Sequence, residues 1–137
     1  VITMLSLPGS RWNQNNNNKD DLRIWNNKEY QLQAALFWRD LAFVLKDHPA
    51  VVGYNLLNEP HPERLFDSTQ VHIQHVKQTE VQAMLYELYS LIIQHIRTVD
   101  TKTPIIIDSS AYADPQTFEF LQPHKDENII YSFHMYE

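Results

Sequence analysis

The chain has 137 residues, no cysteine, two glycines and a formal net charge of −6 at pH 7. Its 43% hydrophobic and 20% charged residues are typical of a globular domain, and the lack of cysteine excludes disulfides and thiolate sites. An acidic chain without a basic cluster is not expected to bind nucleic acid, and no apolar run approaches the roughly 20 residues of a membrane-spanning helix.

Apolar runs that indicate strands alternate with amphipathic segments that indicate helices. The strand-like runs are short and nearly all apolar, as in parallel strands buried on both faces. An Asn-rich stretch near the start is expected to be a solvated surface loop. In chain order the expected elements are strand 1–5, loop 13–21, helix 30–47, strand 51–57, helix 81–99, strand 105–107, a short helical turn 115–121 that Asp114 caps, and strand 128–133.

This alternation predicts an α/β fold in which crossover helices connect parallel strands. Two such architectures compete, the open doubly wound sheet and the closed TIM (β/α)8 barrel. The first usually has a glycine-rich phosphate turn after its first strand, and neither of the two glycines stands in such a turn. Polar residues follow each strand instead, where a barrel has its active face. We therefore expect about four βα units of a barrel.

Glu59 is the first candidate for chemistry, because it stands between Asn58 and Pro60 just past an apolar strand. A carboxyl group at the mouth of an apolar barrel loses solvation, which favours its protonated form and suits it to donate a proton. The alternative interpretation is a glutamate that simply begins a solvated loop.

The run from Val51 to Pro60, which ends in Asn-Glu-Pro, resembles the fourth-strand signature of family 5 glycoside hydrolases, the cellulase family. Two further landmarks occur in the right order. The Pro8-Gly9 turn resembles the end of the third strand, and the closing segment 132–137 resembles the sixth. The resemblance implies that residues 1–137 are a partial catalytic barrel domain, from about strand three to strand six.

The resemblance also implies roles for individual residues. Glu59 would be the general acid/base of a retaining glycosidase, and Asn58 would hold the 2-hydroxyl of the sugar. His134 would bind the sugar or join the active-site hydrogen bonds, while Tyr136 would donate to the nucleophilic carboxylate. Positions two apart on a strand face the same side, so both rings can face the barrel mouth. A histidine buried in the core and satisfied by a neighbour is the alternative for His134.

Other positions are more ambiguous. Trp12 is expected either to stack against a sugar ring or to plug the barrel rim, and Asp108 either to contact substrate or to cap a turn. Leu5 stands where the family often has a histidine, which indicates an altered sugar pocket. His72-x-x-His75 has no third ligand at a recognisable spacing, so we expect no metal and no cofactor.

A retaining glycosidase needs a second carboxyl group about 5–5.5 Å from the acid/base. In family 5 that nucleophile ends the seventh strand, and Glu137 is too close to Tyr136 in the sixth-strand pattern to match it. The chain is therefore expected to be an interior fragment, about half of a ~250-residue barrel, and inactive alone.

The expected partners are a β-linked polysaccharide or oligosaccharide and the remainder of the barrel. Glucan, mannan, β-1,3-glucan and glycolipid stay open as substrates, and secretion is compatible with the resemblance. A non-catalytic fragment that binds carbohydrate is the alternative function.

Overall fold

A computed structural model describes residues 1–66 and 75–135 of the chain, without the side chains of residues 75 and 76. The described residues form one four-stranded sheet in which every neighbouring pair is parallel and the strand order follows the sequence. Sequential parallel order is typical of a barrel, whereas a doubly wound sheet reverses direction at a switch point. The strands are β1 (Ile2–Thr3), β2 (Tyr54–Asn55), β3 (Ile105–Asp108) and β4 (Ile129–Ser132).

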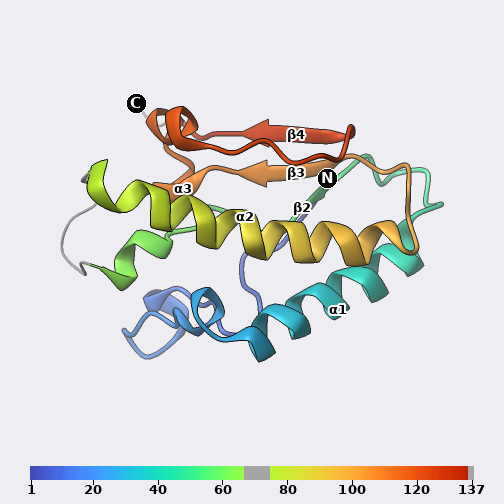
Figure 1. The fold of residues 1–137 in the computed structure, drawn as a ribbon. Helices are drawn as coiled ribbons and strands as arrows, with labels where there is room; N and C mark the ends of the chain where they lie inside the picture. The colour runs from blue at the N-terminus through green and yellow to red at the C-terminus, as the bar shows by residue number, and fades with distance from the viewer. Residues whose placement is uncertain (67–74, 136–137) are drawn as a thin grey trace.

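Two long helices pack side by side along one face of the sheet (Figure 1). Asn27 caps the first of them, because its side chain accepts a hydrogen bond from the Glu29 N–H. No helix among the described residues has the length and apolarity that crossing a bilayer requires. The helices are α1 (Lys28–Leu45), α2 (His75–Arg97) and α3 (Ser110–Ala113), with short 3-10 helices η1 (Asn13–Asn15), η2 (Arg23–Trp25), η3 (Pro62–Leu65) and η4 (Pro115–Phe120).

The expected strands and helices all occur in the expected order, the short helices η1, η2, η3 and α3 are additional, and the largest difference in bounds is at the start of α2. Helix α2 begins six residues before the expected start at residue 81. Its first turns bury two polar side chains, Gln78 and Gln82, which an apolar repeat does not reveal. The expected turn at 115–121 is the 3-10 helix η4, and the Asp114 carboxylate accepts the Gln116 N–H at 2.8 Å as a cap.

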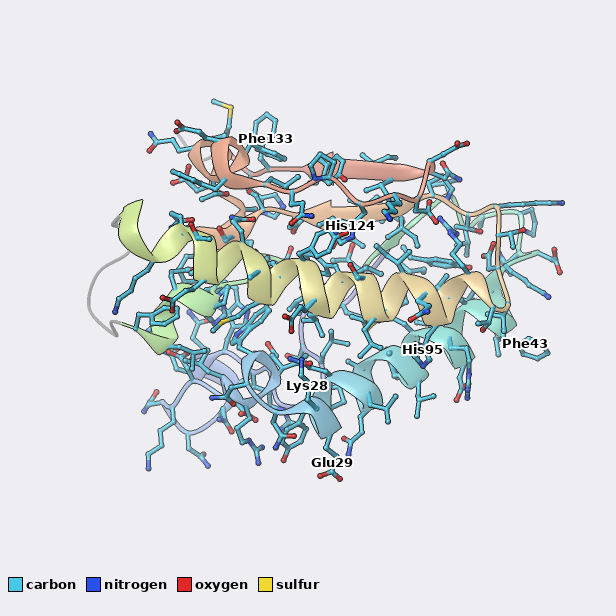
Figure 2. All side chains as sticks on the ribbon, in the orientation of Figure 1. Lys28, Glu29, Phe43, His95, His124 and Phe133 are labelled. Atoms are coloured by element: carbon cyan, nitrogen blue, oxygen red, sulfur yellow. The ribbon has the colours of Figure 1, made fainter. Side chains whose placement is uncertain are left out.

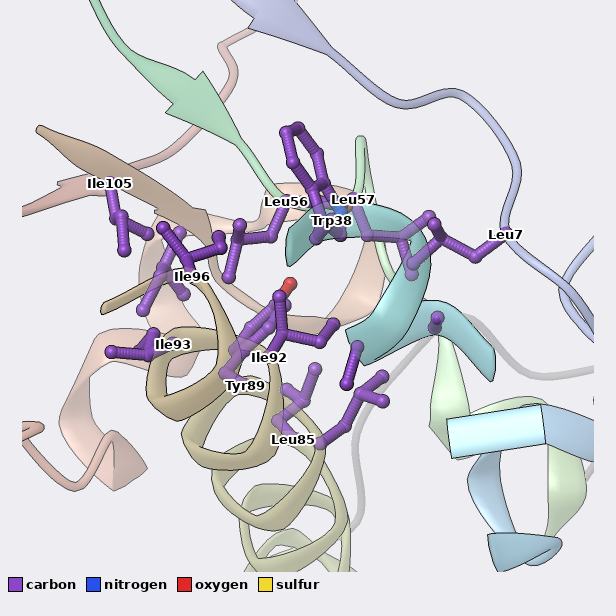
Figure 3. Close-up of a cluster of buried hydrophobic side chains, with 14 of the residues drawn as sticks. Leu7, Trp38, Leu56, Leu57, Leu85, Tyr89, Ile92, Ile93, Ile96 and Ile105 are labelled. Atoms are coloured by element: carbon purple, nitrogen blue, oxygen red, sulfur yellow. Dashed lines mark hydrogen bonds between the residues drawn. The ribbon is translucent and has the colours of Figure 1, made fainter. Parts of the chain in front are cut away.

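The core lies between the helices and the sheet, and it includes Trp38 of α1 (Figure 3). Its ring is fully buried, contacts the Tyr54 ring at a centroid distance of 5.7 Å, and donates its Nε1–H to the Leu56 carbonyl at 3.0 Å. Two residues of α2, Tyr89 and Ile92, complete the contact with the sheet. This packing fixes the strand segment that leads directly to Asn58 and Glu59.

Side chains alternate between the two faces of the sheet. Tyr54 and Ile105 face the helices and are fully buried, and their register neighbours Asn55 and Ile106 therefore point to the second face. Ile130 lies on this second face and is 51% exposed, so the described residues leave it partly uncovered. Apolar side chains are also exposed on α1, where Figure 2 shows Phe43 pointing away from the helices.

A first prediction concerns the packing of α1 on β2. Trp38→Phe removes the Nε1–H donor, so the buried Leu56 carbonyl loses that partner. The smaller ring also leaves a small cavity in the core. We expect a loss of about 2–3 kcal/mol in the free energy of unfolding, measured by urea denaturation. Lys28→Ala is the control, because the exposed 2.9 Å ion pair of Lys28 with Glu87 also joins α1 to α2 but should contribute less than about 1 kcal/mol. Equal losses in the two variants would contradict this account of the core.

Candidate active site at the carboxyl ends of the strands

Three ionisable side chains meet at the carboxyl edge of the sheet. Asp108 is the last residue of β3, Glu59 follows β2 by four residues, and His134 follows β4 by two. Because the three strands are parallel neighbours, their carboxyl ends lie at the same edge. Residues 75 positions apart in the sequence are thus brought into contact.

Glu59 and His134 form the closest pair of this group. The His134 Nδ1 lies 2.6 Å from the Glu59 Oε1, and Glu59 is only 8% exposed. A hydrogen bond at this distance contains one proton, which sits on Nδ1 when Glu59 is ionised and on Oε1 when Glu59 is neutral. The pair can therefore hold a proton at the Glu59 Oε1, at the carboxyl edge of the sheet.

Asp108 lies behind this pair and is completely buried. Its Oδ1 accepts a hydrogen bond from the Asn55 Nδ2 at 3.1 Å, and its Oδ2 accepts the backbone N–H of Glu59 at 3.1 Å. The same Oδ2 lies 3.6 Å from the His134 Nε2. The Asp108 charge and complete burial raise the pKa of the neighbouring Tyr89 well above its usual value, with burial the larger cause.

The backbone at Glu59 is left-handed, with a φ of 49°. This conformation costs a residue with a Cβ roughly 1–2 kcal/mol, and it persists only where the surroundings hold it. Here the Glu59 N–H is held by Asp108, and its carbonyl lies 3.1 Å from the Nδ1 of His61.

A second left-handed segment follows β3, in which Ala111, Tyr112 and Ala113 have φ values of 51°, 63° and 64°. This turn joins the loops that carry the two paired side chains. The Tyr112 N–H donates to the Pro60 carbonyl at 3.1 Å, and the Ala113 carbonyl accepts the His134 N–H at 2.9 Å. The turn therefore helps to place Glu59 and His134 relative to each other.

Three aromatic rings pack together next to Glu59. The rings of His61 and Tyr112 are stacked at 4.9 Å, and Trp12 packs edge-on against both at 5.4 and 5.5 Å. His61 is 3% exposed, and burial lowers its pKa, so that the ring is neutral at pH 7. Trp12 is half-buried, and both interpretations of it, stacking against a sugar ring and plugging the barrel rim, stay predictions.

Glu63 and Arg64 of η3 contact residues of the left-handed turn. The Glu63 Oε2 accepts the Ala111 N–H at 3.4 Å, while its Oε1 is buried without a partner among the described residues. Arg64 donates to the Tyr112 hydroxyl at 2.8 Å and forms an ion pair with Asp20 at 2.9 Å. Burial raises the pKa of Glu63 to about 7.

Sequence comparison matches residues 9–137 to a known family, described as cellulase, glycosyl hydrolase family 5. The chain belongs to glycosyl hydrolase family 5. A search of curated proteins finds no match. The family membership and the parallel sheet together make this chain part of a TIM (β/α)8 barrel.

Solved structures with the family 5 fold resemble the chain over most of its length. An endoglucanase matches with 25% identity and a TM-score of 0.62, over 83% of this chain and 32% of its own. The endoglucanase Cel5A of Pseudomonas stutzeri matches with 23% identity and a TM-score of 0.59, over 97% of this chain and 35% of its own. Cel5A of Thermotoga maritima, in a complex with cellobiose, has 23% identity and a TM-score of 0.63, with coverages of 83% and 32%. The chain thus spans about a third of the length of these proteins.

The remaining family 5 positions are placed as follows. Asn58, which follows the end of β2 at Asn55, is half-buried, and its N–H donates to the Met4 carbonyl at 2.8 Å. Tyr136 lies outside the described residues, as does the side chain of His75. Leu5, at the position of the expected histidine, is 66% exposed.

Sequence reasoning missed how Asn55 and Asp108 connect to the pair. The sequence leaves open whether Asp108 contacts substrate or caps a turn; in the structure it accepts hydrogen bonds from the Asn55 side chain and from the Glu59 N–H that follows β2. A signal was present, since an acid that ends the otherwise apolar run Ile105–Ile107 is expected to be buried and paired. No comparable signal marks the turn at 111–113, because alanine and tyrosine do not favour left-handed backbone.

A second prediction follows from the buried carboxyl group of Glu63. Its pKa is about 7 in the folded chain against 4.5 for the ordinary group, so the folded state binds the proton more tightly than the unfolded state. Folding stability should therefore fall as the pH rises from about 4.5 to about 7, by up to about 3 kcal/mol, and stay level above that window. Glu63→Gln, which cannot titrate, should remove this dependence in urea unfolding measured at several pH values.

The exposed Glu119 of η4 provides the control for this experiment. Glu119→Gln removes a carboxyl group from the surface and should leave the stability profile of the parent chain unchanged between pH 4.5 and 7. A Glu63→Gln variant with the same slope as the parent would show that Glu63 does not titrate in this window.

Proposed function

We propose that this chain supplies the acid/base half of a retaining glycosidase that hydrolyses β-linked saccharides, with Glu59 as the general acid/base. The observation that carries the proposal is the Glu59 carboxyl group, buried at the carboxyl edge of the sheet and 2.6 Å from the His134 ring. A carboxyl group in this position can hold a proton, lose it to a leaving oxygen and recover it from water.

The reaction is a double displacement. A carboxylate attacks the anomeric carbon while Glu59 protonates the glycosidic oxygen, which leaves with its aglycone. Water then attacks the anomeric carbon of the covalent glycosyl-enzyme and displaces the carboxylate, while the ionised Glu59 takes a proton from the water. The attacking carboxylate lies outside these 137 residues in our proposal, because Asp108 is fully buried and both of its oxygens accept hydrogen bonds within the fold.

The other candidates assist this reaction. His134 shares a proton with Glu59 and orients its Oε1. Asn58, at the end of the β2 segment, would bind the 2-hydroxyl of the sugar, where a hydrogen bond strengthens in the transition state. Tyr136 would donate to the nucleophile. Trp12 would offer the exposed part of its ring to a neighbouring sugar unit.

The substrate we propose is a β-1,4-linked glucan or mannan oligosaccharide. Structures of Thermotoga maritima Cel5A contain cellobiose and mannotriose. The endo-glycoceramidase II of Rhodococcus, with 27% identity and a TM-score of 0.50 over 64% of this chain, represents a glycolipid alternative.

Residues 1–137 would form part of one catalytic barrel domain, and the remainder of the barrel would be the main protein partner. The exposed apolar side chains on the second face of the sheet and along α1 support this proposal, because a closed barrel covers both surfaces. They include Ile130, Phe43 and Val44.

A non-catalytic fragment that binds carbohydrate is a second candidate, favoured by Leu5 in place of the family's histidine. Titration of cello- and manno-oligosaccharides against the full-length protein distinguishes the two functions. Binding without any turnover would support the second candidate and contradict the first.

A third prediction tests the role of Glu59 in the full-length protein. Glu59→Gln should lower kcat/KM for cello-oligosaccharides by about 10²–10⁴-fold, because the leaving oxygen then departs without a proton. For a dinitrophenyl glycoside kcat/KM should stay nearly unchanged, since its leaving group needs little protonation, whereas kcat should fall because the water that attacks the glycosyl-enzyme loses its general base. The products are quantified by chromatography and by absorbance.

Asp100→Asn serves as a control in the same assay, because it removes a buried carboxyl group that precedes β3, at the opposite end of that strand from the Glu59 site. The isolated 137-residue chain should hydrolyse neither substrate, for lack of a nucleophile. Hydrolysis by the isolated chain that Glu59→Gln abolishes would overturn the assignment of the nucleophile to another segment.

A further inference from the structure

The geometry behind the acid/base points to a further residue of the site. We propose that Asp108 is a positioning residue that fixes both the backbone of Glu59 and the ring of His134. This inference rests on the proposed role of Glu59 and goes beyond it, because it explains how the carboxyl group is held at one place and angle.

The first support is the backbone of Glu59. Its left-handed φ of 49° turns the chain sharply after the β2 segment, and the backbone N–H then points at the Asp108 Oδ2, 3.1 Å away. A relaxed backbone at Glu59 would move this N–H away from Asp108 and turn the side chain elsewhere. A carboxylate acceptor makes the hydrogen bond stronger than a neutral acceptor does, which helps to offset the strain.

The second support is the position of the His134 ring between two carboxyl groups. Its Nδ1 faces the Glu59 Oε1 at 2.6 Å, and its Nε2 faces the Asp108 Oδ2 at 3.6 Å. The longer contact is beyond hydrogen-bond distance, and it attracts the ring to Asp108 whenever Nε2 carries a proton, as it does when Nδ1 accepts the proton of a neutral Glu59. The same Asp108 oxygen therefore acts on the backbone of Glu59 and on the ring that meets its side chain.

The third support is that Asp108 is itself immobile. It is completely buried, its Oδ1 accepts the Asn55 Nδ2, and its backbone carbonyl accepts the Tyr89 hydroxyl at 3.3 Å. Its β3 position is paired with Ser132 of β4, two residues before His134. Asp108 thus has a fixed place relative to both strands that carry the pair.

Asp100 provides a matched control, because it is also a buried carboxylate that accepts several hydrogen bonds. It is 4% exposed and accepts from the Tyr54 hydroxyl and from the N–H groups of Lys102 and Thr103. It precedes β3, at the opposite end from Asp108, and it contacts neither Glu59 nor His134 among the described residues. Its removal tests the general effect of a lost buried carboxylate.

The experiment compares Asp108→Asn, Asp100→Asn and Glu59→Gln in the full-length protein, on aryl glycosides with leaving groups from dinitrophenol to unsubstituted phenol. Asparagine has one oxygen in place of two, so either Asn55 or the Glu59 N–H loses its acceptor. We expect Asp108→Asn to lower kcat/KM at least about tenfold for phenol and less than about threefold for dinitrophenol. Asp100→Asn should show no such dependence on the leaving group.

An equal loss with all leaving groups in Asp108→Asn would overturn the inference, because it indicates a general structural role. If Asp108→Asn does not fold, Asn55→Ala decides, since it keeps the Asp108 carboxylate but removes one of its hydrogen-bond donors. A smaller loss of kcat/KM that is again greater for phenol than for dinitrophenol supports the inference. Absence of any such loss overturns the inference. If Glu59→Gln itself shows no leaving-group dependence, the proposed function fails. The two failures are therefore distinguishable.

Discussion

The carboxylate of Asp108 accepts one hydrogen bond from the side chain of Asn55 and another from the backbone of Glu59. The end of β3 is therefore bonded both to β2 and to the residue that follows it by four positions. Burying a charge without partners is costly, and these contacts offset that cost only when the strands are in register. The edge that carries Glu59 and His134 therefore forms as a unit with the sheet. A shift of one residue in β2 would turn Asn55 away from Asp108.

The two faces of the sheet have different physical tasks. The face toward α1 and α2 carries the apolar contacts around Trp38 that stabilise the strands. The opposite face carries Asn55 and Asp108, and Asp108 also accepts the backbone N–H of Glu59. Because neighbouring residues alternate between faces, each strand contributes to both tasks within a few positions. The chemistry is thus built on strands whose positions are fixed by packing rather than on free loops.

Much of this arrangement could be predicted from the sequence. Short apolar runs and helical periodicity predicted the order of the elements, and the Asn-Glu-Pro signature with the spacing of His134 indicated two side chains that the structure brings together. The start of α2 could not be predicted from apolar periodicity, because Gln78 is a buried polar residue. The partners of Asp108 depend on three strands in register, which no local pattern contains.

Most of the residues with left-handed backbone lie near the carboxyl edge of the sheet. Of the six non-glycine residues with positive φ among those described, two are exposed asparagines of the surface loop, a residue type that tolerates this conformation. The other four are Glu59 and the turn at 111–113. Hydrogen bonds link Glu59 to Asp108, Ala111 to Glu63, Tyr112 to Pro60 and Ala113 to the N–H of His134, so each strained residue is held by another segment.

Strain that is stabilised in this way fixes one conformation at the expense of stability. A fixed conformation favours general acid catalysis, because a proton donor must be within hydrogen-bond reach of the leaving oxygen before the glycosidic bond breaks. The contacts that orient Glu59 described here all come from these 137 residues. A second carboxylate supplied by the rest of a barrel would therefore meet a proton donor that is already in place.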